Sequence, residues 1–368
     1  MELTQNELEY WMSTIPKIGT VKIGKLLNFF GSERAIFESG RTVIEASGCI
    51  TASEAEILAY SRDIERIKRE YEKMCKKNIR LISIHEEEYP EKLRVIAKAP
   101  YSLFLRGRLP EKNRVSVAIV GARSCTSYGK ELAQWFGREL SKAGIQVISG
   151  MAYGVDGCAH WGALRGRTPT YAVLGSGIDV CYPRENYELY MHLQQKGGIL
   201  SEYAPGVQGK GFQFPMRNRI ISGLSDAVLV IEARERSGSL ITADLALEQG
   251  KDVFAVPGRV GDPLSGGCLN LLKQGAEPVT CPEDIIENFH LREMVERHTL
   301  EKEPCTLDTP EKKIYAALSL EPKHIDQIIL ETNMVMTQVF SILLKMELDG
   351  YVRQPVKNHY VRSILGTE

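Results

Sequence analysis

The sequence predicts an α/β protein with a parallel β-sheet at its centre, a small helical domain before it and a second small domain after it. Three observations support this fold class. Residues 1–76 show only helical periodicity, residues 77–292 alternate short β-rich runs with helical stretches, and residues 310–368 return to helices that end in a β-hairpin pattern. Residues 293–309 are charged and contain Pro304, so we expect them to form a linker.

The composition is that of an ordinary globular protein. Of the 368 residues, 43% are hydrophobic and 25% are charged, and no run approaches the roughly 20 apolar residues of a membrane helix. The N-terminus lacks a basic start followed by an apolar stretch, and the eight cysteines form no Cys-x-x-Cys pair. We therefore expect a reduced, cytoplasmic protein without a signal peptide, a membrane segment or a metal site. Because the net charge is −1, a nucleic-acid ligand would have to be bound by cations gathered locally.

The N-terminal domain contains a glycine turn between two apolar segments. In residues 15–32 this turn precedes Leu26, Leu27 and Phe30 at helical spacing, a pattern typical of a SAM-like or helix-hairpin-helix-like domain. Such a turn can offer backbone N–H groups to a DNA phosphate, and it is equally a way to pack two short helices. The sequence leaves both interpretations open.

In the central domain, predicted strands alternate with predicted helices, which is typical of a parallel sheet covered by helices on both faces. The predicted strands are 115–121, 145–150, 170–177, 198–202, 226–233 and 252–258. The predicted helices are 128–144, 155–167, 184–197, 217–225 and 239–250. Two earlier β-rich runs, 78–84 and 101–107, should extend the sheet.

The C-terminal domain reads as a winged helix. Three helical segments, 311–320, 324–332 and 334–352, precede a hairpin around the sequence VKNH. The third helix should place a stripe of apolar side chains in the core: Val335, Val339, Ile342, Leu343 and Met346. We assign no DNA-binding role to this domain from its sequence.

Four glycine-rich turns follow predicted strands, at 120–129, 148–160, 174–183 and 232–243. The carboxyl ends of parallel strands are where open sheets bind ligands, and helix N-termini there offer free N–H donors. The turns therefore predict a pocket for phosphate groups. They contain neither Gly-x-Gly-x-x-Gly nor Gly-x-x-x-x-Gly-Lys-Ser/Thr, so dinucleotide and P-loop sites are not indicated.

Cations and aromatics are placed beside these turns. Arg123 lies in the first turn, and the stretch GKGFQFPMRNRIISG (209–223) combines Lys210 and Arg217 with two phenylalanines. Lys210 and the two arginines can neutralise phosphates, while Phe212 or Phe214 can stack a base, which is how proteins hold single strands. In the alternative interpretation, Phe214 anchors the loop beside Pro215.

The two arginines of this stretch should have different roles. Arg217 and Arg219 are two residues apart at a helix start, so their side chains point in different directions. We expect Arg217 to face DNA and Arg219 to pair with a buried acid such as Glu232.

No catalytic constellation is apparent. Asp156 and His160 are four residues apart on a predicted helix, which is compatible with an acid–base pair but is more typical of a structural hydrogen bond. No third ligand at metal spacing accompanies them, and no serine or cysteine has the setting of a nucleophile. We therefore predict a binding protein without catalytic residues, metal or cofactor.

Taken together, these motifs resemble the DNA-processing protein A family (DprA, also called Smf). The segments that carry the resemblance are VGAR, SGMAYGVDGCAH, AVLGSGIDVCYPREN, FPMRNRIISGLSDAVLVIEA, SGSLITADLALEQGKDVFAVPG and GCLNLLKQGA, from Val120 to Ala276. The resemblance implies an extended Rossmann fold that binds single-stranded DNA without catalysis. It also implies protection of incoming DNA, loading of the RecA recombinase during natural transformation, and a homodimer formed through the Rossmann domain.

The family motifs transfer onto individual residues of this chain. DNA contacts are implied for Arg123 and Lys210, and a base contact for Phe214. Further candidates come from the same motifs and the pocket turns: Arg217, Asn218, Ser149, Gly150, Ser176, Gly177, Gly238 and Ser239.

Two other functions remain as alternatives. A nucleotide-processing Rossmann enzyme, such as a nucleoside-monophosphate phosphoribohydrolase, would need a Pro-Gly-Gly-x-Gly-Thr-x-x-Glu signature, and the nearest segment, RSGSLITADLA, lacks its glycine run and glutamate. A transcription regulator would use the winged helix, and a preference for duplex DNA would favour it.

Overall fold

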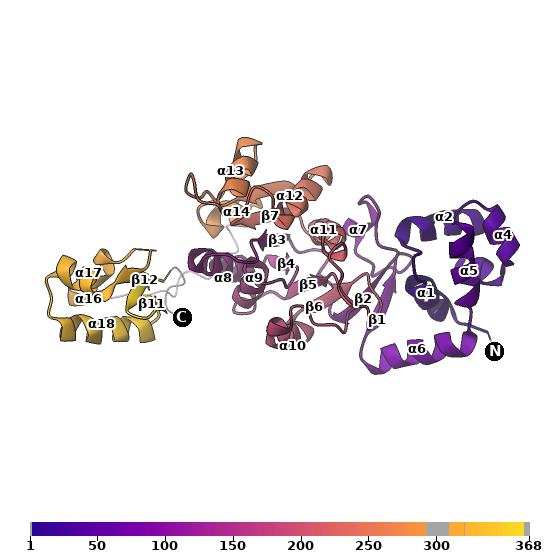
Figure 1. The fold of residues 1–368 in the computed structure, drawn as a ribbon, viewed down its shortest axis with the longest axis horizontal. Coiled ribbons are helices and arrows are strands. Elements are labelled where there is room, and N and C mark those ends of the chain that lie inside the picture. The colour runs from indigo at the N-terminus through magenta and orange to yellow at the C-terminus, as the bar shows by residue number, and fades with distance from the viewer. Residues whose placement is uncertain (1, 292–308, 320, 364–368) are drawn as a thin grey trace.

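The computed structural model describes residues 2–291, 309–319 and 321–363. Figure 1 shows three parts in a row: a helical N-terminal region, a central sheet with helices on both faces, and a small C-terminal domain. The sequence-predicted fold class is confirmed. The predicted linker, including Pro304, lies almost wholly outside the described residues.

The N-terminal region is a bundle of six short helices, and local side chains cap the starts of four of them. The Thr4 hydroxyl accepts a hydrogen bond from the Glu7 amide, and the Glu7 carboxylate accepts one from the Thr4 amide, so a capping box starts the first helix. The predicted glycine turn is present, with Gly19 at the start of the second helix. The helices are α1 (Gln5–Thr14), α2 (Thr20–Phe30), α3 (Glu33–Glu38), α4 (Arg41–Ala46), α5 (Ala52–Tyr60) and α6 (Ile64–Lys76). The four with capped starts are α1, α3, α5 and α6.

This bundle shares one hydrophobic core with the edge of the sheet. The Tyr10 ring meets the Phe104 ring edge-on at 6.5 Å, and the hydroxyls of Ser13 and Ser102 are hydrogen-bonded at 2.6 Å. The bundle is therefore packed directly against the first strands of the central domain.

Within the described residues, nine strands form one sheet in the order β1-β2-β6-β5-β4-β3-β7-β8-β9. Their bounds are β1 (Arg80–Ser83), β2 (Ser102–Gly107), β3 (Ser116–Gly121), β4 (Gln146–Ser149), β5 (Thr170–Leu174), β6 (Gly198–Ser201), β7 (Ala227–Ile231), β8 (Asp252–Ala255) and β9 (Glu277–Pro278). Strands β3 to β9 are parallel, whereas β1 and β2 extend the sheet in antiparallel pairing. The strand order reverses between β3 and β7, which is the switch point where open sheets bind ligands.

Alternate side chains of β3 point into two different helical layers. Val117 and Ile119 join the core formed with α8 and α9, while Ala118 and Val120 join the core under α11 and α12. A Cβ on Gly162 of α9 would lie 2.1 Å from the Gln134 carbonyl oxygen of α8, so only glycine permits this close helix contact. The helices are α7 (Glu91–Arg94), α8 (Ser127–Lys142), α9 (Val155–Ala163), α10 (Tyr187–Lys196), α11 (Gln213–Leu224), α12 (Gly238–Glu248), α13 (Gly266–Lys273) and α14 (Pro282–Asn288), with a 3-10 turn at Arg184–Asn186.

Helix α11 begins four residues earlier than the predicted start at Arg217. Its first turn includes Phe214 and Pro215. Proline fits there because the amides of the first turn have no intrahelical partner, so its missing N–H costs no hydrogen bond. Its ring also fixes φ near the helical value. The aromatic–cation stretch is therefore largely helical, and its side chains have fixed directions.

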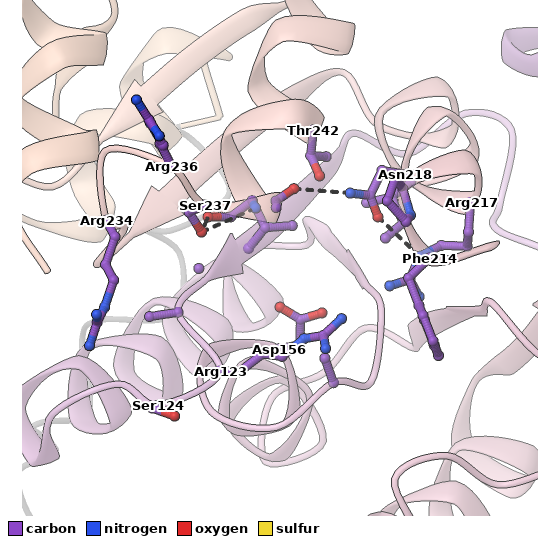
Figure 2. A pocket seen from close by; sticks show the side chains of 18 of the residues that line it. Arg123, Ser124, Asp156, Phe214, Arg217, Asn218, Arg234, Arg236, Ser237 and Thr242 are labelled. Atoms are coloured by element: carbon purple, nitrogen blue, oxygen red, sulfur yellow. Dashed lines mark hydrogen bonds between the residues drawn. The ribbon is translucent and has the colours of Figure 1, made fainter. Parts of the chain in front are cut away.

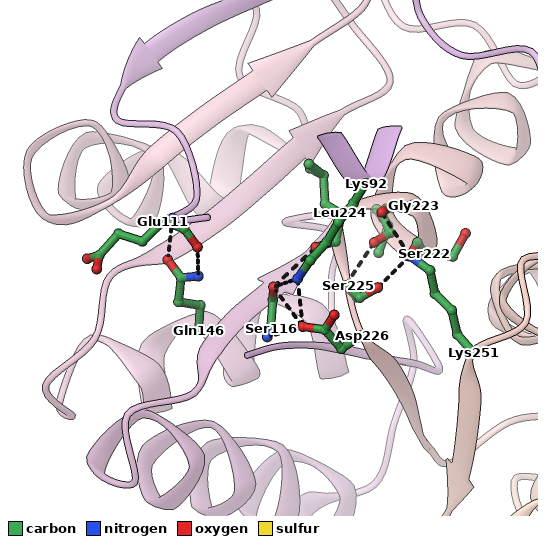
Figure 3. A network of polar contacts seen from close by, with 11 residues as sticks. Lys92, Glu111, Ser116, Gln146, Ser222, Gly223, Leu224, Ser225, Asp226 and Lys251 are labelled. Atoms are coloured by element: carbon green, nitrogen blue, oxygen red, sulfur yellow. Dashed lines mark hydrogen bonds and ion pairs between the residues drawn. The ribbon is translucent and has the colours of Figure 1, made fainter. Parts of the chain in front are cut away.

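A polar network holds the far end of α11 at the amino edge of the sheet (Figure 3). The Lys251 ammonium donates to the Ser222 and Gly223 carbonyls at 2.6 and 2.8 Å and also to the Ser225 carbonyl. Burial lowers the pKa of Lys251 to about 8. A cation on the carbonyls at a helix C-terminus is favourable, and this contact fixes the helix that carries the candidate site.

The C-terminal domain is a winged helix built of α16 (Thr309–Ala317), α17 (Ile325–Thr332) and α18 (Met336–Leu348) with a small sheet of β10 (Lys323–His324), β11 (Val352–Val356) and β12 (His359–Arg362). Val339, Leu343 and Met346 are buried as predicted, and Ile342 is partly buried. The prediction for Val335 is wrong: it precedes the first turn of α18 and is 69% exposed, because the helix starts at Met336, two residues later than predicted.

Among the described helices, no single one is long and apolar enough to cross a bilayer. Only α17 and α18 taken together, bent by 112° at their junction, meet the length and composition criteria.

Candidate nucleic-acid interface

A cavity of about 470 Å³ lies at the switch point between β3 and β7 (Figure 2). The turn after β3 and the turn after β7 form two of its sides. The first turns of α11 and α12 form the others. The sequence-predicted pocket at the carboxyl ends of the strands is therefore present as a space.

Four arginines line this cavity: Arg123, Arg217, Arg234 and Arg236. Among the described residues that line it, Asp156 is the only acid. Burial raises the pKa of Asp156, although Arg217 and Arg123 act in the opposite direction, and its carboxylate accepts a hydrogen bond from the Gly150 amide at 3.1 Å. The excess of cations makes the cavity suited to an anion with several charges.

The N-terminus of α12 faces the same space. The Ser237 hydroxyl caps it by accepting from the Ser239 amide at 3.3 Å, and the Asn218 side-chain amide donates to the Gly238 carbonyl at 3.1 Å. No acidic residue lies in the first turn of α12. The Thr242 hydroxyl, on a residue only 1% exposed, lines the cavity (Figure 2). An uncompensated helix N-terminus beside arginines is the arrangement that binds phosphate.

Arg123 and Phe214 meet at the mouth. The Arg123 guanidinium carbon lies 5.5 Å from the centre of the Phe214 ring, and the Tyr182 ring lies 5.2 Å from it, tilted by 37°. Phe214 also packs on Gly175, where a Cβ would lie 2.7 Å from the ring. The ring is thus partly buried and partly presented to solvent. This position is compatible both with loop packing and with a base contact, the two roles predicted for it.

Arg217 was expected to face DNA, but its side chain is turned away from solvent. It is 4% exposed, and its Nη1 donates to the Gly150 carbonyl at 2.9 Å and to the Val173 carbonyl. Its Nε donates to the Asn218 side chain at 3.2 Å. Burial lowers the pKa of Arg217 to about 10, so the guanidinium remains charged at neutral pH. Arg217 thus ties together the ends of β4 and β5 while contributing its charge to the cavity wall.

The partner predicted for Arg219 is wrong. Its Nη2 donates to Glu202 at 2.6 Å, not to Glu232. Glu232 instead accepts from the Thr126 amide at 2.7 Å at the start of α8. Glu202 directly follows β6, and no sequence pattern indicated that β6 and α11 are neighbours.

Several predicted turn residues stabilise the loops instead of lining the cavity. The buried Ser149 hydroxyl donates to the Ile119 carbonyl at 2.6 Å, and the buried Ser176 hydroxyl donates to the Val180 carbonyl at 2.9 Å. The Gly177 amide donates to the Val207 carbonyl at 2.7 Å. Gly150 lies against Arg217, where a Cβ would be 2.4 Å from the guanidinium, so the glycine makes room for that side chain.

The remaining predicted residues divide between the cavity and its approach. Asn218, Gly238 and Ser239 line the cavity. Lys210 lies outside its lining, in the exposed segment before α11. Its ammonium makes no ion pair within the described part of the chain. It is therefore available to a ligand that extends beyond the pocket.

Asp156 and His160 do not form the predicted hydrogen bond. The His160 Nδ1 is 2.7 Å from the Thr170 hydroxyl, and the ring is fully buried. Burial lowers the pKa of His160 to about 3, so the ring is neutral. The described residues contain no group of three His, Cys, Asp or Glu side chains placed to hold a metal ion.

Four side chains of this region were not predicted from the sequence: Arg234, Arg236, Tyr153 and Tyr182. Arg234 and Arg236 line the cavity, and their signal was present as two cations directly after the strand 226–233. Tyr153 and Tyr182 line a smaller hollow that adjoins the cavity at Arg123 and Phe214. The tyrosines come from two different turns, so only the folded chain shows that they lie beside Phe214.

Fold and site define a Rossmann-type protein with a cationic pocket at the sheet switch point, an aromatic rim and an attached winged helix. Residues 80–290 match the family model of DNA recombination-mediator protein A, and residues 298–355 match that of the DprA winged helix domain. The chain belongs to this DprA/Smf family.

Named relatives and solved structures agree with this assignment. The chain is 38% identical over 261 residues to DNA processing protein DprA of Bacillus subtilis, covering 69% of this chain and 86% of the relative. It is 38% identical over 291 residues to Protein Smf of Escherichia coli, covering 77% and 78%. The X-ray structure of DprA from Streptococcus pneumoniae superposes with a TM-score of 0.66 at 34% identity, over 78% of this chain and 98% of that one.

A second solved structure concerns a ligand. DNA processing protein A from Helicobacter pylori, whose structure is described as giving insight into its unique single-stranded DNA binding mode, superposes with a TM-score of 0.53 at 30% identity. The match covers 58% of this chain and 95% of that one.

Proposed function

We propose that this chain binds single-stranded DNA at the cavity between β3 and β7 and acts as a recombination mediator that loads RecA onto that DNA. The observation that carries the proposal is Arg123 lying across Phe214 at the mouth of an arginine-lined pocket. Cations that neutralise phosphates beside rings that can stack bases suit an unpaired strand, because a duplex hides the base faces. The Helicobacter pylori relative, described as binding single-stranded DNA, supports the choice of ligand.

We expect different cations of the site to bind successive phosphates of the strand. The helix α12 N-terminus, with Arg234 and Arg236, is placed to hold phosphates inside the cavity, and Arg123 holds one at the mouth. Lys210, beyond the cavity, continues the cationic path. Such contacts go to the backbone, so binding should depend on salt and only weakly on base sequence.

The role in recombination rests on family membership. We propose that the protein covers incoming single strands during natural transformation, acts as a homodimer formed through the Rossmann domain, and works without catalysis or cofactor. The family model is that of a recombination mediator, which supports RecA as the partner.

The test compares binding of fluorescent single-stranded and duplex oligonucleotides of equal length by anisotropy over a range of salt concentrations. We expect the single strand to bind more tightly, with a linear decrease of log K with log salt. RecA filament assembly on the same strand, with single-strand-binding protein present, should start sooner when this protein is added. A preference for duplex would instead favour a winged-helix regulator, and turnover of a nucleotide would favour an enzyme.

A further inference from the structure

The winged-helix domain has an apolar stripe on the exposed side of α18. Four residues spaced by four positions, Met336, Phe340, Leu344 and Leu348, are between 49% and 81% exposed. Residues at this spacing form a continuous ridge on a helix, here about 18 Å long at about 1.5 Å per residue. A contiguous exposed apolar surface of this kind marks an interaction site.

The chemistry of this surface does not suit duplex DNA. Lys345 is the only cation of α18, all of whose residues are described, and it is ion-paired with Glu311 at 2.7 Å. A helix that reads DNA presents cations and hydrogen-bond donors to phosphates and base edges. Met336, Phe340, Leu344 and Leu348 offer neither. The stripe is therefore suited to a protein surface that is itself apolar.

We propose that the stripe binds the same stripe of a second copy of this chain, with the two α18 helices antiparallel about a two-fold axis at residue 342. In this register Met336 lies opposite Leu348 of the second copy, and Phe340 lies opposite its Leu344. Each apolar residue of the stripe then faces an apolar residue, as a self-complementary two-fold interface requires. Ridges of residues four apart are also the ridges that interdigitate most often when two helices pack.

Charge complementarity supports the second copy as the occupant. The N-terminus of α18 has no side-chain cap and no acidic residue in its first turn, so its positive end is uncompensated. Glu347 is two turns after Phe340 and hence on the same side of the helix. The same two-fold axis places Glu347 of each copy opposite Thr337, in the first turn of the other. The apolar match and the charge match therefore require one and the same register.

The first test measures self-association of the full chain by sedimentation velocity over a concentration series. We expect Phe340→Glu and Leu344→Lys each to abolish one association step that the wild-type chain shows. The matched control is Tyr60→Glu, which also places a charge on an 80% exposed apolar position but at the N-terminal end of the molecule, and it should keep the step. Because the stripe lies outside the Rossmann domain, dimerisation through that domain would persist in all variants.

The second test checks the register by mixing the two charged variants. In a mixed pair, the Phe340→Glu position of one chain faces the Leu344→Lys position of the other, while the second contact of the pair remains Leu344 against Phe340. We expect the mixture to regain the lost step at low salt and to lose it again at high salt. The proposal is overturned if the single variants associate like the wild type, or if the wild type shows no step that they lack. It is also overturned if the mixture stays as dissociated as each variant alone. Loss of duplex DNA binding in variants that keep full self-association would overturn it too, because the stripe would then be a DNA-binding surface.

Discussion

The guanidinium carbon of Arg123 lies 5.5 Å from the centre of the Phe214 ring, and this contact joins the turn after β3 to the first turn of α11. One side chain supplies a charge for a phosphate and the other supplies a ring for a base. Because the cation covers part of the ring, a base that stacks on that face must displace it. The two residues are thus coupled, and substitution of either should change the contribution of the other.

Arg123→Ala should weaken binding to single strands of different base sequence by similar factors, because the lost contact is to a phosphate. The slope of log K against log salt should become shallower by about 0.7, the value for one phosphate contact on a single strand. We expect the same of Lys210→Ala. Arg66→Ala is the matched control, since Arg66 is an exposed cation on α6 paired with Glu70. Unchanged affinity and slope in both site variants would remove these residues from the site.

Arg234→Ala and Arg236→Ala should each also weaken single-strand binding and reduce its salt slope. Both residues line the cavity beside the N-terminus of α12, where their charges add to the helix dipole. Anisotropy titrations with short oligonucleotides measure this effect. If only Arg123→Ala and Lys210→Ala lower the affinity, the strand runs past the cavity and does not enter it.

Phe214→Ala should cost roughly 1–3 kcal/mol of binding free energy if the ring stacks a base. Phe212→Ala is the matched control for an aromatic in the same segment, because Phe212 is 66% exposed and does not line the cavity. Binding and thermal unfolding should be measured on the same samples. A large decrease in Tm with normal DNA affinity would make Phe214 a packing residue that supports the turn at Gly175.

Glu202→Ala should lower the free energy of unfolding by about 3 kcal/mol, because it leaves the buried Arg219 guanidinium without its partner. Glu70→Ala removes the partner of an exposed arginine and should cost less than about 1 kcal/mol. Chemical denaturation of the two variants provides the comparison. Equal effects would mean that solvent replaces Glu202 without cost.

Stability should fall as the pH decreases from about 6.5 toward 3, partly because of His160. Its pKa is about 3 in the folded protein, against about 6.5 in an unfolded chain, so the unfolded state binds the extra proton in this range. The loss should reach up to about 1.4 kcal/mol per pH unit from this group alone. Denaturation at pH 4 to 7 should show a shallower dependence for His160→Gln than for the wild type. Parallel curves would mean that folding does not lower the pKa of His160.

Much of the fold could be predicted because it is encoded by local periodicity. The strand at 115–121 and the helix at 128–144 were found within one or two residues of β3 and α8, since their apolar spacing is set by backbone geometry. The predicted start of α11 at Arg217 was four residues late, because the helix takes Pro215 into its first turn, where proline is tolerated. The antiparallel pairing of β1 and β2 could not be read from periodicity, which is the same for either strand direction.

The sequence by itself determined the α/β class, the winged helix, and the kinds of residues at the candidate site, with Arg123 and Phe214 among them. Only the tertiary structure decided which of these meet. In the folded chain Arg217 is buried against the turn at Gly150, and Arg219 pairs with Glu202. Arg234 and Arg236 line the same cavity as Arg123. The physical reason is that short-range periodicity specifies which face of an element is buried, whereas strand order specifies which distant turns become neighbours. The reversal of that order between β3 and β7 is what creates the cavity.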